Sequence, residues 1–333
     1  MRETMRKARR EAAAFAPATV GNVGVGFDVL GHVLTSIGDT VWVRRLEDRV
    51  VRMVTATPPY LPADAASNTG GAGLLRLIAD LDLPFGFEVR VRKGIPLGSG
   101  MGGSAASAAA AIVAANELLD EPLSTDQLLE YGMHGEAVAT GAYHADNLAP
   151  CLLGGLVLVR GSEPPDAVRI PVPEELRCVL VHPELRVDTR EARAMLPPTV
   201  SLHDHVVQSG NLAALVAGCH SGDFELISRA LTDIIVEPHR GRLVRGFHEV
   251  QGAALAAGAL GCSLSGSGPS MFAWCIGEAD GVRIRQAMVS AFQSVGVQAR
   301  GWISRVDGPG ARVVTAVPEQ ASVDAGSEER WSE

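Results

Sequence analysis

The stretch KGIPLGSGMGGSAA, residues 93–106, combines the residue types of an anion-binding loop. Its glycines let the backbone turn tightly and bring N–H groups close to a ligand. If a helix begins where the loop ends, its first N–H groups have no partner within the helix, and the helix dipole adds partial positive charge there. A phosphate group suits both features. We therefore interpret residues 93–106 as a phosphate-binding loop.

The flanking segments predict the elements that would position this loop. Before it, Phe87, Val89 and Val91 alternate with charged residues, which predicts an antiparallel strand with one face exposed to water. After it, residues 104–119 are almost entirely good helix formers and apolar residues. The order is therefore strand, glycine-rich turn and helix N-terminus.

Two other kinds of phosphate-binding loop fit the surrounding sequence less well. Residues 98–103 match the dinucleotide pattern G-x-G-x-x-G, but the strand before that pattern is buried on both faces and should be almost wholly apolar. A dinucleotide-binding fold also needs a second strand that ends in an acidic residue about 20 positions further on. At that place this sequence predicts more helix instead. A Walker A loop would need Lys-Ser or Lys-Thr after the glycines. A turn without a ligand is the remaining alternative, but it would leave so many glycines at a helix start unexplained.

Two more glycine-rich stretches, residues 15–31 and 261–269, occur in the chain. Asp28 lies in the first, between Phe27 and Val29. It either caps local N–H groups in a turn or is a partly buried acid that meets a cation such as a substrate ammonium. Three glycine-rich loops exceed what turns alone require. A kinase that uses all three is the simplest chemistry that explains them.

Several polar residues have both a structural and a functional interpretation. Glu136 lies on a helix predicted to start at Ser124, where it is either a solvated residue or, if the fold brings it to the phosphate loop, a ligand of Mg²⁺. The run Ser67-Asn68-Thr69 could cap a helix over residues 70–81. His144 is expected to form hydrogen bonds rather than bind metal, because no second His or Cys stands at ligand spacing.

The remaining chain alternates between helical and strand-like segments. We expect Asp188 to cap a helix on which Thr189 and Arg193 share a face. Further helices are predicted at residues 204–220, 223–236, 244–258 and 282–295, with a turn at 237–242. Strands are predicted at residues 40–55, 152–160, 178–182, 271–276 and 301–317.

The composition of the 333 residues limits the class of protein. The net charge of −9 disfavours binding to nucleic acid or to an anionic membrane, and no apolar run reaches the roughly 18 residues of a membrane span. The five scattered cysteines predict reduced thiols of a cytoplasmic protein. We expect a flexible extension at residues 1–13, domains at 14–165 and 174–317 with a boundary in the proline-rich stretch 162–173, and a disordered tail at 319–333.

At its three glycine-rich stretches, the chain resembles the GHMP kinases. The family's first motif is similar to APA, residues 16–18, through GFD, residues 26–28; its second to residues 96–105; and its third to SGSGP, residues 265–269. The sequences GFDVLG at 26–31, HADNLAP at 144–150, DTREAR at 188–193 and EPHR at 237–240 most resemble the homoserine kinases of that superfamily. The similarity extends from about residue 14 to residue 316.

The resemblance implies a fold and an activity. The fold would be α+β with two domains, an N-terminal ATP-binding domain like ribosomal protein S5 and a C-terminal α/β sandwich. The activity would be ATP-dependent phosphorylation of the side-chain hydroxyl of L-homoserine, with Mg²⁺ and ATP as cofactors. Members of the family are commonly homodimers.

Residue by residue, the resemblance implies three groups of site residues. Ser104 and Glu136 would hold Mg²⁺. The amino-acid pocket would consist of Asn22, Asp28, Asn147, Thr189, Arg193 and Arg240. The nucleotide would meet Asn68, Pro96, Leu97, Gly98, Ser99, Gly100, Met101, Gly102, Gly103, Ser104, Ala105, Ala106, Gly266, Ser267 and Gly268.

Within the pocket, charge predicts how the substrate is held. Asp28 suits an ammonium, and Arg193 and Arg240 suit a carboxylate, because Arg can donate two parallel hydrogen bonds to it. The alternative is that both arginines form surface ion pairs with acidic neighbours. No side chain is singled out as a general base, and the hydroxyl would be activated by its position near the γ-phosphate.

The sequence departs from the family pattern at one position, and three alternative functions stay open. Gly103 stands where the family usually has the first of two serines, so one phosphate hydrogen bond is lost while the backbone N–H is kept. The rivals are another GHMP kinase such as a mevalonate-type enzyme, a non-catalytic sensor of the same fold, and a Rossmann-type oxidoreductase.

Overall fold

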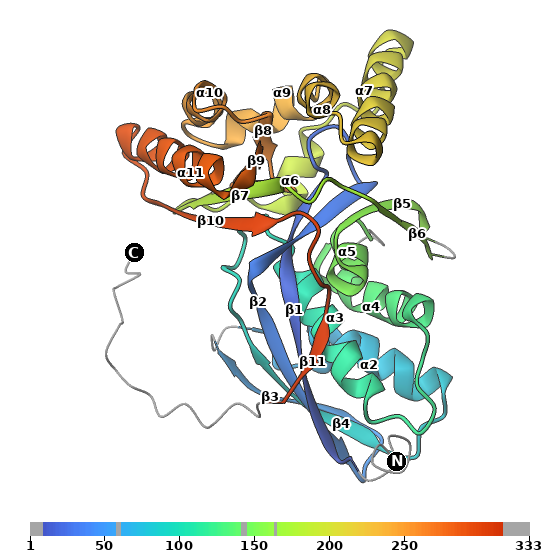
Figure 1. Ribbon diagram of the computed structural model, residues 1–333. Coiled ribbons are helices and arrows are strands. Elements are labelled where there is room, and N and C mark those ends of the chain that lie inside the picture. Colours follow the sequence, from blue (N-terminus) through green and yellow to red (C-terminus); the bar gives the residue numbers. More distant parts are fainter. Residues whose placement is uncertain (1–8, 58–60, 141–144, 163–164, 316–333) are drawn as a thin grey trace.

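The structure is a computed structural model that describes residues 9–57, 61–140, 145–162 and 165–315 (Figure 1). Residues 1–8 of the predicted extension, His144 and the predicted tail at 319–333 lie outside the described residues. Within the described part of the chain, no helix is long and apolar enough to cross a membrane.

A mixed seven-stranded sheet forms the first layer of the molecule. Its strands run in the order β11-β1-β2-β4-β3, and β5 and β6 extend it from β2. Their bounds are β1 Glu11–Gly21, β2 Leu30–Leu46, β3 Val51–Thr57, β4 Gly86–Arg92, β5 Leu156–Ser162, β6 Pro165–Ile170 and β11 Arg312–Val314. The predicted alternation at residues 87–91 is β4, which pairs antiparallel with β2 and parallel with β3.

Four helices cover one face of this sheet: α2 Thr69–Asp80, α3 Gly103–Asn116, α4 Thr125–Thr140 and α5 Leu148–Leu153 (Figure 1). A short 3₁₀ turn, Ala65–Ser67, precedes α2, and Asn68 caps α2 as predicted, since its Oδ1 accepts from the N–H of Gly70 at 2.9 Å. Helix α3 is central, and its small alanine side chains are buried almost throughout. Small side chains let a helix approach its neighbours closely, so the alanine-rich sequence suits this position.

A four-stranded antiparallel sheet forms the second part of the molecule, in the order β10-β7-β9-β8. The strands are β7 Leu176–Pro183, β8 Gly261–Leu264, β9 Met271–Ile276 and β10 Ala299–Arg305. The helices are α6 Thr189–Ala194, α7 Leu202–Ser221, α8 Phe224–Ala230, α9 Glu237–Arg240, α10 Phe247–Ala256 and α11 Gly277–Ser294, with a 3₁₀ turn at Gly241–Leu243. Helices α10 and α11 pack on this sheet over a core of their own.

Several predicted segments differ from the structure. The strands predicted at 40–55 and 301–317 are each interrupted, at residues 47–50 and 306–311. The strand predicted at 152–160 begins only at Leu156, because residues 148–153 form α5 and the glycine pair at 154–155 ends it with positive φ angles. The proline-rich stretch 162–173 contains β6, which pairs with β5, so it is not a free linker. The helix predicted at 223–236 ends at Ala230, because residues 231–236 turn around the buried carboxylate of Asp233.

The first sheet takes strands from both ends of the described chain, and its core is continuous with that of the second sheet. Strand β1 begins at Glu11, inside the predicted extension, and β11 pairs with β1 although its residues were expected in the second domain. The main hydrophobic core includes Leu180 and Trp274 of the second sheet together with residues of the first. Buried His32 of β2 accepts a hydrogen bond from the indole of Trp274 at 3.1 Å. The two units are therefore one packed structure.

Candidate active site

The three glycine-rich loops meet at the junction of the two sheets. The backbone N–H of Thr19, in the first loop region, donates to the carbonyl of Met101 at 3.0 Å. The hydroxyl of Ser265, in the third, donates to the carbonyl of Gly100 at 2.7 Å. The second loop, residues 96–104, is thus held from both sides by segments that lie far away in the sequence.

The geometry of this second loop explains its glycines. Gly98, Gly100 and Gly102 have φ angles of 64°, 73° and 63°, a region that favours glycine. A Cβ atom on Gly100 would lie 2.5 Å from the carbonyl oxygen of Gly268, and one on Gly102 would lie 1.9 Å from Oγ1 of Thr19. Glycine is therefore required both by the turn and by the close approach of the neighbouring loops.

The loop and the start of α3 line a cavity of about 480 Å³. Gly102 stands at the N-cap position of α3 and provides no side-chain cap. The N–H groups of the first helical turn therefore donate to no side chain at the N-cap position, and they offer a site for an anion. The cavity is also lined by Asn68, Lys93, Glu136, Asn147, Thr189, Gly266 and Ser267.

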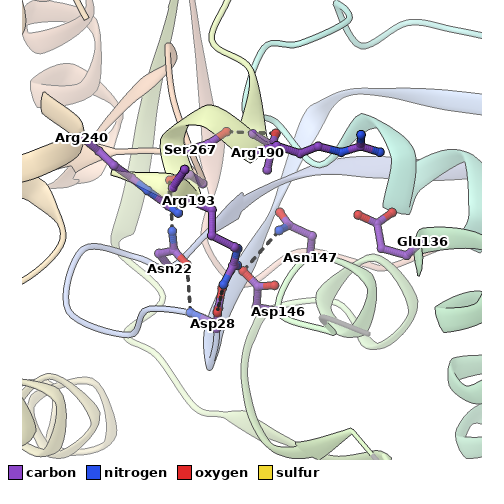
Figure 2. Close-up of a pocket in the computed structure, with 12 residues that line it drawn as sticks. Asn22, Asp28, Glu136, Asp146, Asn147, Arg190, Arg193, Arg240 and Ser267 are labelled. Atoms are coloured by element: carbon purple, nitrogen blue, oxygen red, sulfur yellow. Dashed lines mark hydrogen bonds and ion pairs between the residues drawn. The ribbon is translucent and has the colours of Figure 1, made fainter. Parts of the chain in front are cut away.

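A second cavity of about 360 Å³ adjoins the first (Figure 2). Its polar lining comes from Asn22, Asp28, Glu136, Asp146, Asn147, Thr189, Arg190, Arg193, Arg240 and Ser267. The structure thus brings all six residues predicted for the amino-acid pocket to one cavity. Glu136, Asn147, Thr189, Gly266 and Ser267 line both cavities. These shared residues mark the border across which a group could be transferred.

Ser104 and Glu136 meet at this border, although 32 residues separate them. The Ser104 hydroxyl donates to Oε1 of Glu136 at 2.9 Å, and Glu136 is almost fully buried. Burial raises the pKa of Glu136 to about 8, against the smaller opposing effect of the Ser104 hydrogen bond. A cation beside this carboxylate would favour its charged form.

The donor set here fits Mg²⁺ better than a metal held by protein alone. The described residues contain no group of three or more His, Cys, Asp or Glu side chains that could hold a metal ion. One carboxylate and one hydroxyl beside a cavity lined by an anion-binding loop match the way Mg²⁺ binds, with few protein oxygens, phosphate oxygens and water. Ser104 and Glu136 are therefore the residues that would hold it.

The second cavity, called the acceptor cavity from here on, contains a bidentate ion pair between Asp28 and Arg193. The two guanidinium nitrogens lie 2.9 and 2.8 Å from the two carboxylate oxygens. Asp28 adopts a φ of 59°, and its N–H donates to Oδ1 of Asn22 at 3.0 Å. Asp188 caps α6, which carries Arg193, through the N–H groups of residues 190 and 191, as predicted. Arg193 thus does pair with an acid, as the alternative interpretation expected, but the pair lies in the cavity.

Arg240 is held differently, because it is buried and contacts backbone carbonyls. Its Nε donates to the carbonyl of Ala192 at 3.2 Å and its Nη1 to that of Gly266 at 3.4 Å. The guanidinium groups of both arginines lie over the ring of Phe27, at 5.2 Å for Arg193 and 5.0 Å for Arg240. Burial lowers the pKa of Arg240, and so does the nearby charge of Arg193. An anion entering this cavity would offset that cost.

Comparisons with known proteins agree with this geometry. The family model for the GHMP kinase N-terminal domain matches residues 71–155, and that for the C-terminal domain matches residues 212–294. The homoserine kinase of Xanthomonas campestris is 50% identical over 92% of this chain and 94% of its own, and that of Xylella fastidiosa strain 9a5c is 47% identical over 92% and 95%. The chain belongs to the homoserine kinases of the GHMP kinase family. The crystal structure of homoserine kinase from Cytophaga hutchinsonii is 43% identical, covers 92% of this chain and 98% of its own, and gives a TM-score of 0.89. The two-domain GHMP fold expected from the sequence is thereby confirmed.

Asp146 is a residue of the acceptor cavity that the sequence interpretation missed. It is almost fully buried, lines the acceptor cavity and accepts a hydrogen bond from the side chain of Asn147 at 3.2 Å. Burial, followed by the nearby charge of Asp28, raises its pKa to about 7. Its position directly before Asn147 was the available signal, but an acid beside a predicted site residue does not reveal which way it points.

Lys93 and Asp39 are a second pair without an assigned role in the sequence interpretation. The Lys93 ammonium donates to the Asp39 carboxylate, to the carbonyl of Gly103 at 2.6 Å and to the hydroxyl of Ser107 at 3.1 Å. A Cβ atom on Gly103 would lie 3.2 Å from both Nζ of Lys93 and Cγ2 of Ile95. Position 103, where the family pattern predicts serine, is therefore tightly bounded here, and glycine fits it.

Three residues expected to meet the nucleotide do not line either cavity. Ala105 and Ala106 are fully buried in the main core, because their positions on α3 face the first sheet and its helices. Gly268 belongs to the third loop but packs behind Gly100. Their predicted contact with nucleotide can involve only the backbone, and it remains a prediction.

Proposed function

We propose that this chain transfers the γ-phosphoryl group of ATP to the side-chain hydroxyl of L-homoserine, forming O-phospho-L-homoserine in threonine biosynthesis. One observation carries the proposal: a phosphate-loop cavity shares a border with a cavity that contains both carboxylates and arginines. Homoserine carries an ammonium, a carboxylate and a hydroxyl. The second cavity offers partners for both charged groups while the hydroxyl faces the border.

The nucleotide side relies on backbone groups. Residues 96–104 and the N-terminus of α3 would bind the phosphates of ATP. Ser104 and Glu136 would hold Mg²⁺, which neutralises phosphate charge when bound. Gly266 and Ser267 line both cavities and would close the site over the transferred group.

The acceptor cavity would distinguish substrates by their charges. Asp28 would bind the ammonium, while Arg193 and Arg240 would bind the carboxylate. In the free protein Asp28 and Arg193 satisfy each other, so a ligand that separates them must supply one charge of each sign. A neutral sugar or a monoanion such as mevalonate would leave a charge unpaired, and sites built on polar groups can reject such analogues by about 10⁴-fold.

Phosphoryl transfer requires mainly that the protein positions the reacting groups and stabilises the charge of the phosphoryl group. The hydroxyl oxygen forms a bond to the γ-phosphorus, the bond from that phosphorus to the bridging oxygen breaks, ADP leaves and the hydroxyl proton is released. Asn147 and Thr189 stand at the shared border, where they can orient the hydroxyl. Asn147 is itself fixed, because its Oδ1 accepts from the hydroxyl of Thr19 at 2.8 Å.

Three further features belong to the proposal. The five buried cysteines, all free thiols, support a cytoplasmic location. The resemblance to homoserine kinases supports a homodimer. The net charge of −9 supports small molecules rather than nucleic acid or a membrane surface as partners.

Initial rates of ADP release with Mg-ATP test the proposed reaction. The acceptors are L-homoserine, mevalonate, galactose and shikimate at matched concentrations, and phosphorus NMR identifies the product. We expect L-homoserine to be turned over much faster than the other three. Equal or faster turnover of any of them would contradict the assignment, and binding without turnover of any acceptor would favour a non-catalytic sensor.

A further inference from the structure

Helix α7 lies at the edge of the second part of the molecule beside α8 (Figure 1). None of its residues lines either cavity. One side chain on α7, the amide of Gln208, nevertheless bonds to two segments that carry residues of the acceptor cavity. Neither segment is its neighbour in the sequence.

The amide of Gln208 makes three hydrogen bonds. Its Nε2 donates to the carbonyl of Val25 at 3.1 Å and to Oδ1 of Asp233 at 2.9 Å. Its Oε1 accepts from the N–H of Ile234 at 3.1 Å. Both hydrogens and the oxygen of the amide are therefore used, which fixes its orientation.

The first partner belongs to the loop that presents Asp28. Val25 lies midway between Asn22 and Asp28, and the N–H of Asp28 donates to the side chain of Asn22. A bond to the carbonyl of Val25 therefore restrains the turn from which both side chains enter the cavity. Asn22 and Asp28 adopt positive φ angles of 69° and 59°, so the turn holds a backbone conformation that non-glycine residues rarely adopt.

The second partner belongs to the segment that presents Arg240. Asp233 is almost fully buried, and its carboxylate accepts from the N–H groups of residues 235, 236 and 237 at 2.9, 3.0 and 2.9 Å. Those groups lead directly into the short helix α9, which ends at Arg240. Gln208 thus joins the turn under Asp28 to the turn that starts α9.

Asn211, one turn further along α7, provides a comparison within the same helix. Its side chain donates to the carbonyl of Thr232 at 2.9 Å. This bond also docks α7 on the segment before α9, but it does not reach the loop of Asp28. Docking of the helix and coupling of the two turns can therefore be separated by mutation.

We propose that Gln208 is a positioning residue for the amino-acid end of the acceptor site. Its amide sets the separation between the turn that carries Asp28 and the turn that leads to Arg240, so it governs recognition of the substrate's ammonium and carboxylate without touching the substrate. The proposal rests on the proposed function, since it assigns this end of the cavity to homoserine.

The kinetic test compares near-isosteric variants of the two amides. Gln208→Met removes all three bonds, Gln208→Glu keeps only the acceptor for Ile234, and Asn211→Leu is the matched control. We expect each Gln208 variant to raise KM for L-homoserine about tenfold or more, because small displacements of positioning groups are costly. KM for ATP should stay within about twofold, and Asn211→Leu should change neither value by more than that. Equal effects on both substrates, or equal effects of the Gln208 and Asn211 variants, would overturn the proposal.

Hydrogen–deuterium exchange tests the same proposal without activity. In Gln208→Met, amides of residues 22–29 and 234–240 should exchange faster than in the wild type, while those of residues 98–106 stay unchanged. Exchange that is unaltered in the first two segments would overturn the positioning role. A wild-type protein that fails to phosphorylate homoserine would instead overturn the proposed function, whatever the exchange result.

Discussion

Two buried carboxyl groups, those of Glu136 and Asp146, line the acceptor cavity. Burial raises the pKa of Glu136 to about 8 and that of Asp146 to about 7. Both groups therefore keep a proton in the folded protein at pH values where the unfolded chain has lost it. The folded state binds more protons, so these groups make the free energy of unfolding fall as pH rises from their ordinary values to these raised ones.

In the upper part of this pH range, the fall in the free energy of unfolding comes mainly from Glu136. Between about pH 7 and 8, buried His32 and His182 are neutral in the folded state, because burial lowers their pKa to about 4, and they are almost neutral when unfolded. We expect the melting temperature of the nucleotide-free protein to fall over this interval, and Glu136→Gln to flatten the fall. Calorimetry at several pH values measures it, and an equal slope in both proteins would contradict the raised pKa.

The same substitution tests the role of Glu136 in the reaction. Glu136→Gln keeps the shape but removes the charge that would meet Mg²⁺, so kcat should drop by about 10²-fold or more. Steady-state rates across a Mg²⁺ titration measure the loss. Glu130→Gln, an exposed residue of the same helix, is the control and should leave kcat unchanged. Near-normal kcat in Glu136→Gln at ordinary Mg²⁺ would mean that this carboxylate has only a structural role.

Among the elements, the strand β4, the phosphate loop and α3 depend on one buried ion pair. Asp39 accepts from the N–H groups of Gly94 and Ile95 at 3.0 and 3.2 Å, while Lys93 donates to the carbonyl of Gly103 at the start of α3. The pair therefore ties the end of β4 to the N-terminus that would bind phosphate. A buried charge that loses its partner is strongly destabilising.

Lys93→Met tests this link. It leaves the Asp39 carboxylate buried without its cation, so we expect the free energy of unfolding to fall by about 3–5 kcal/mol. The double variant Lys93→Met with Asp39→Asn removes both charges and should recover part of the loss. Urea unfolding of the three proteins measures this. A double variant less stable than Lys93→Met would contradict the account of a mutually neutralising pair.

The elements also show how far sequence patterns could predict this fold. Local signals worked where neighbouring residues determine the outcome, as with the strand at 87–91, the alanine-rich helix after the loop, and the caps Asn68 and Asp188. They failed where distant pairing decides. Residues 165–170 form a strand despite proline and charge because β5 offers an edge for pairing. Residues 312–314 form a strand as predicted, but they pair with β1 and not within the second domain, where they were expected.

At the site, the sequence could predict which residue types take part, but it could not predict which side chains lie next to one another in the fold. The resemblance selected Ser104 and Glu136, and the structure places their side chains 2.9 Å apart. No pattern in the sequence indicated that Asp28 and Arg193, which are 165 positions apart, form a bidentate pair. Asp146, Lys93 and Gln208 were missed because their importance lies in contacts made by the folded chain.

For the whole molecule, the central question is whether the two sheets act as one unit. Nδ1 of His32, in the first sheet, lies 2.9 Å from the carbonyl oxygen of Val33, and Nε2 of the same ring accepts from the indole of Trp274, in the second sheet. With Nε2 as acceptor, Nδ1 carries the proton and donates to that carbonyl. The ring thus joins the two sheets inside a shared core.

Trp274→Phe tests this connection. It leaves Nε2 of buried His32 without its donor, which costs about 1–3 kcal/mol in addition to the loss of packing. We expect a lower melting temperature with a single transition, because the continuous core still couples the sheets. Trp302→Phe, the same change on strand β10, is the control and should cost less. Two separate transitions in the wild-type protein would contradict the view of one cooperative unit.

The most direct test of the whole account is the substrate dependence of Arg193→Lys and Arg240→Lys. Both substitutions keep the charge and remove the planar fork that suits a carboxylate. If the smaller cavity binds the amino acid and the larger one ATP, each variant raises KM for L-homoserine about tenfold or more and leaves KM for ATP within about twofold. Parallel losses in ATP affinity would place these arginines in the nucleotide site, and unchanged values for both substrates would leave the smaller cavity without a role in substrate recognition.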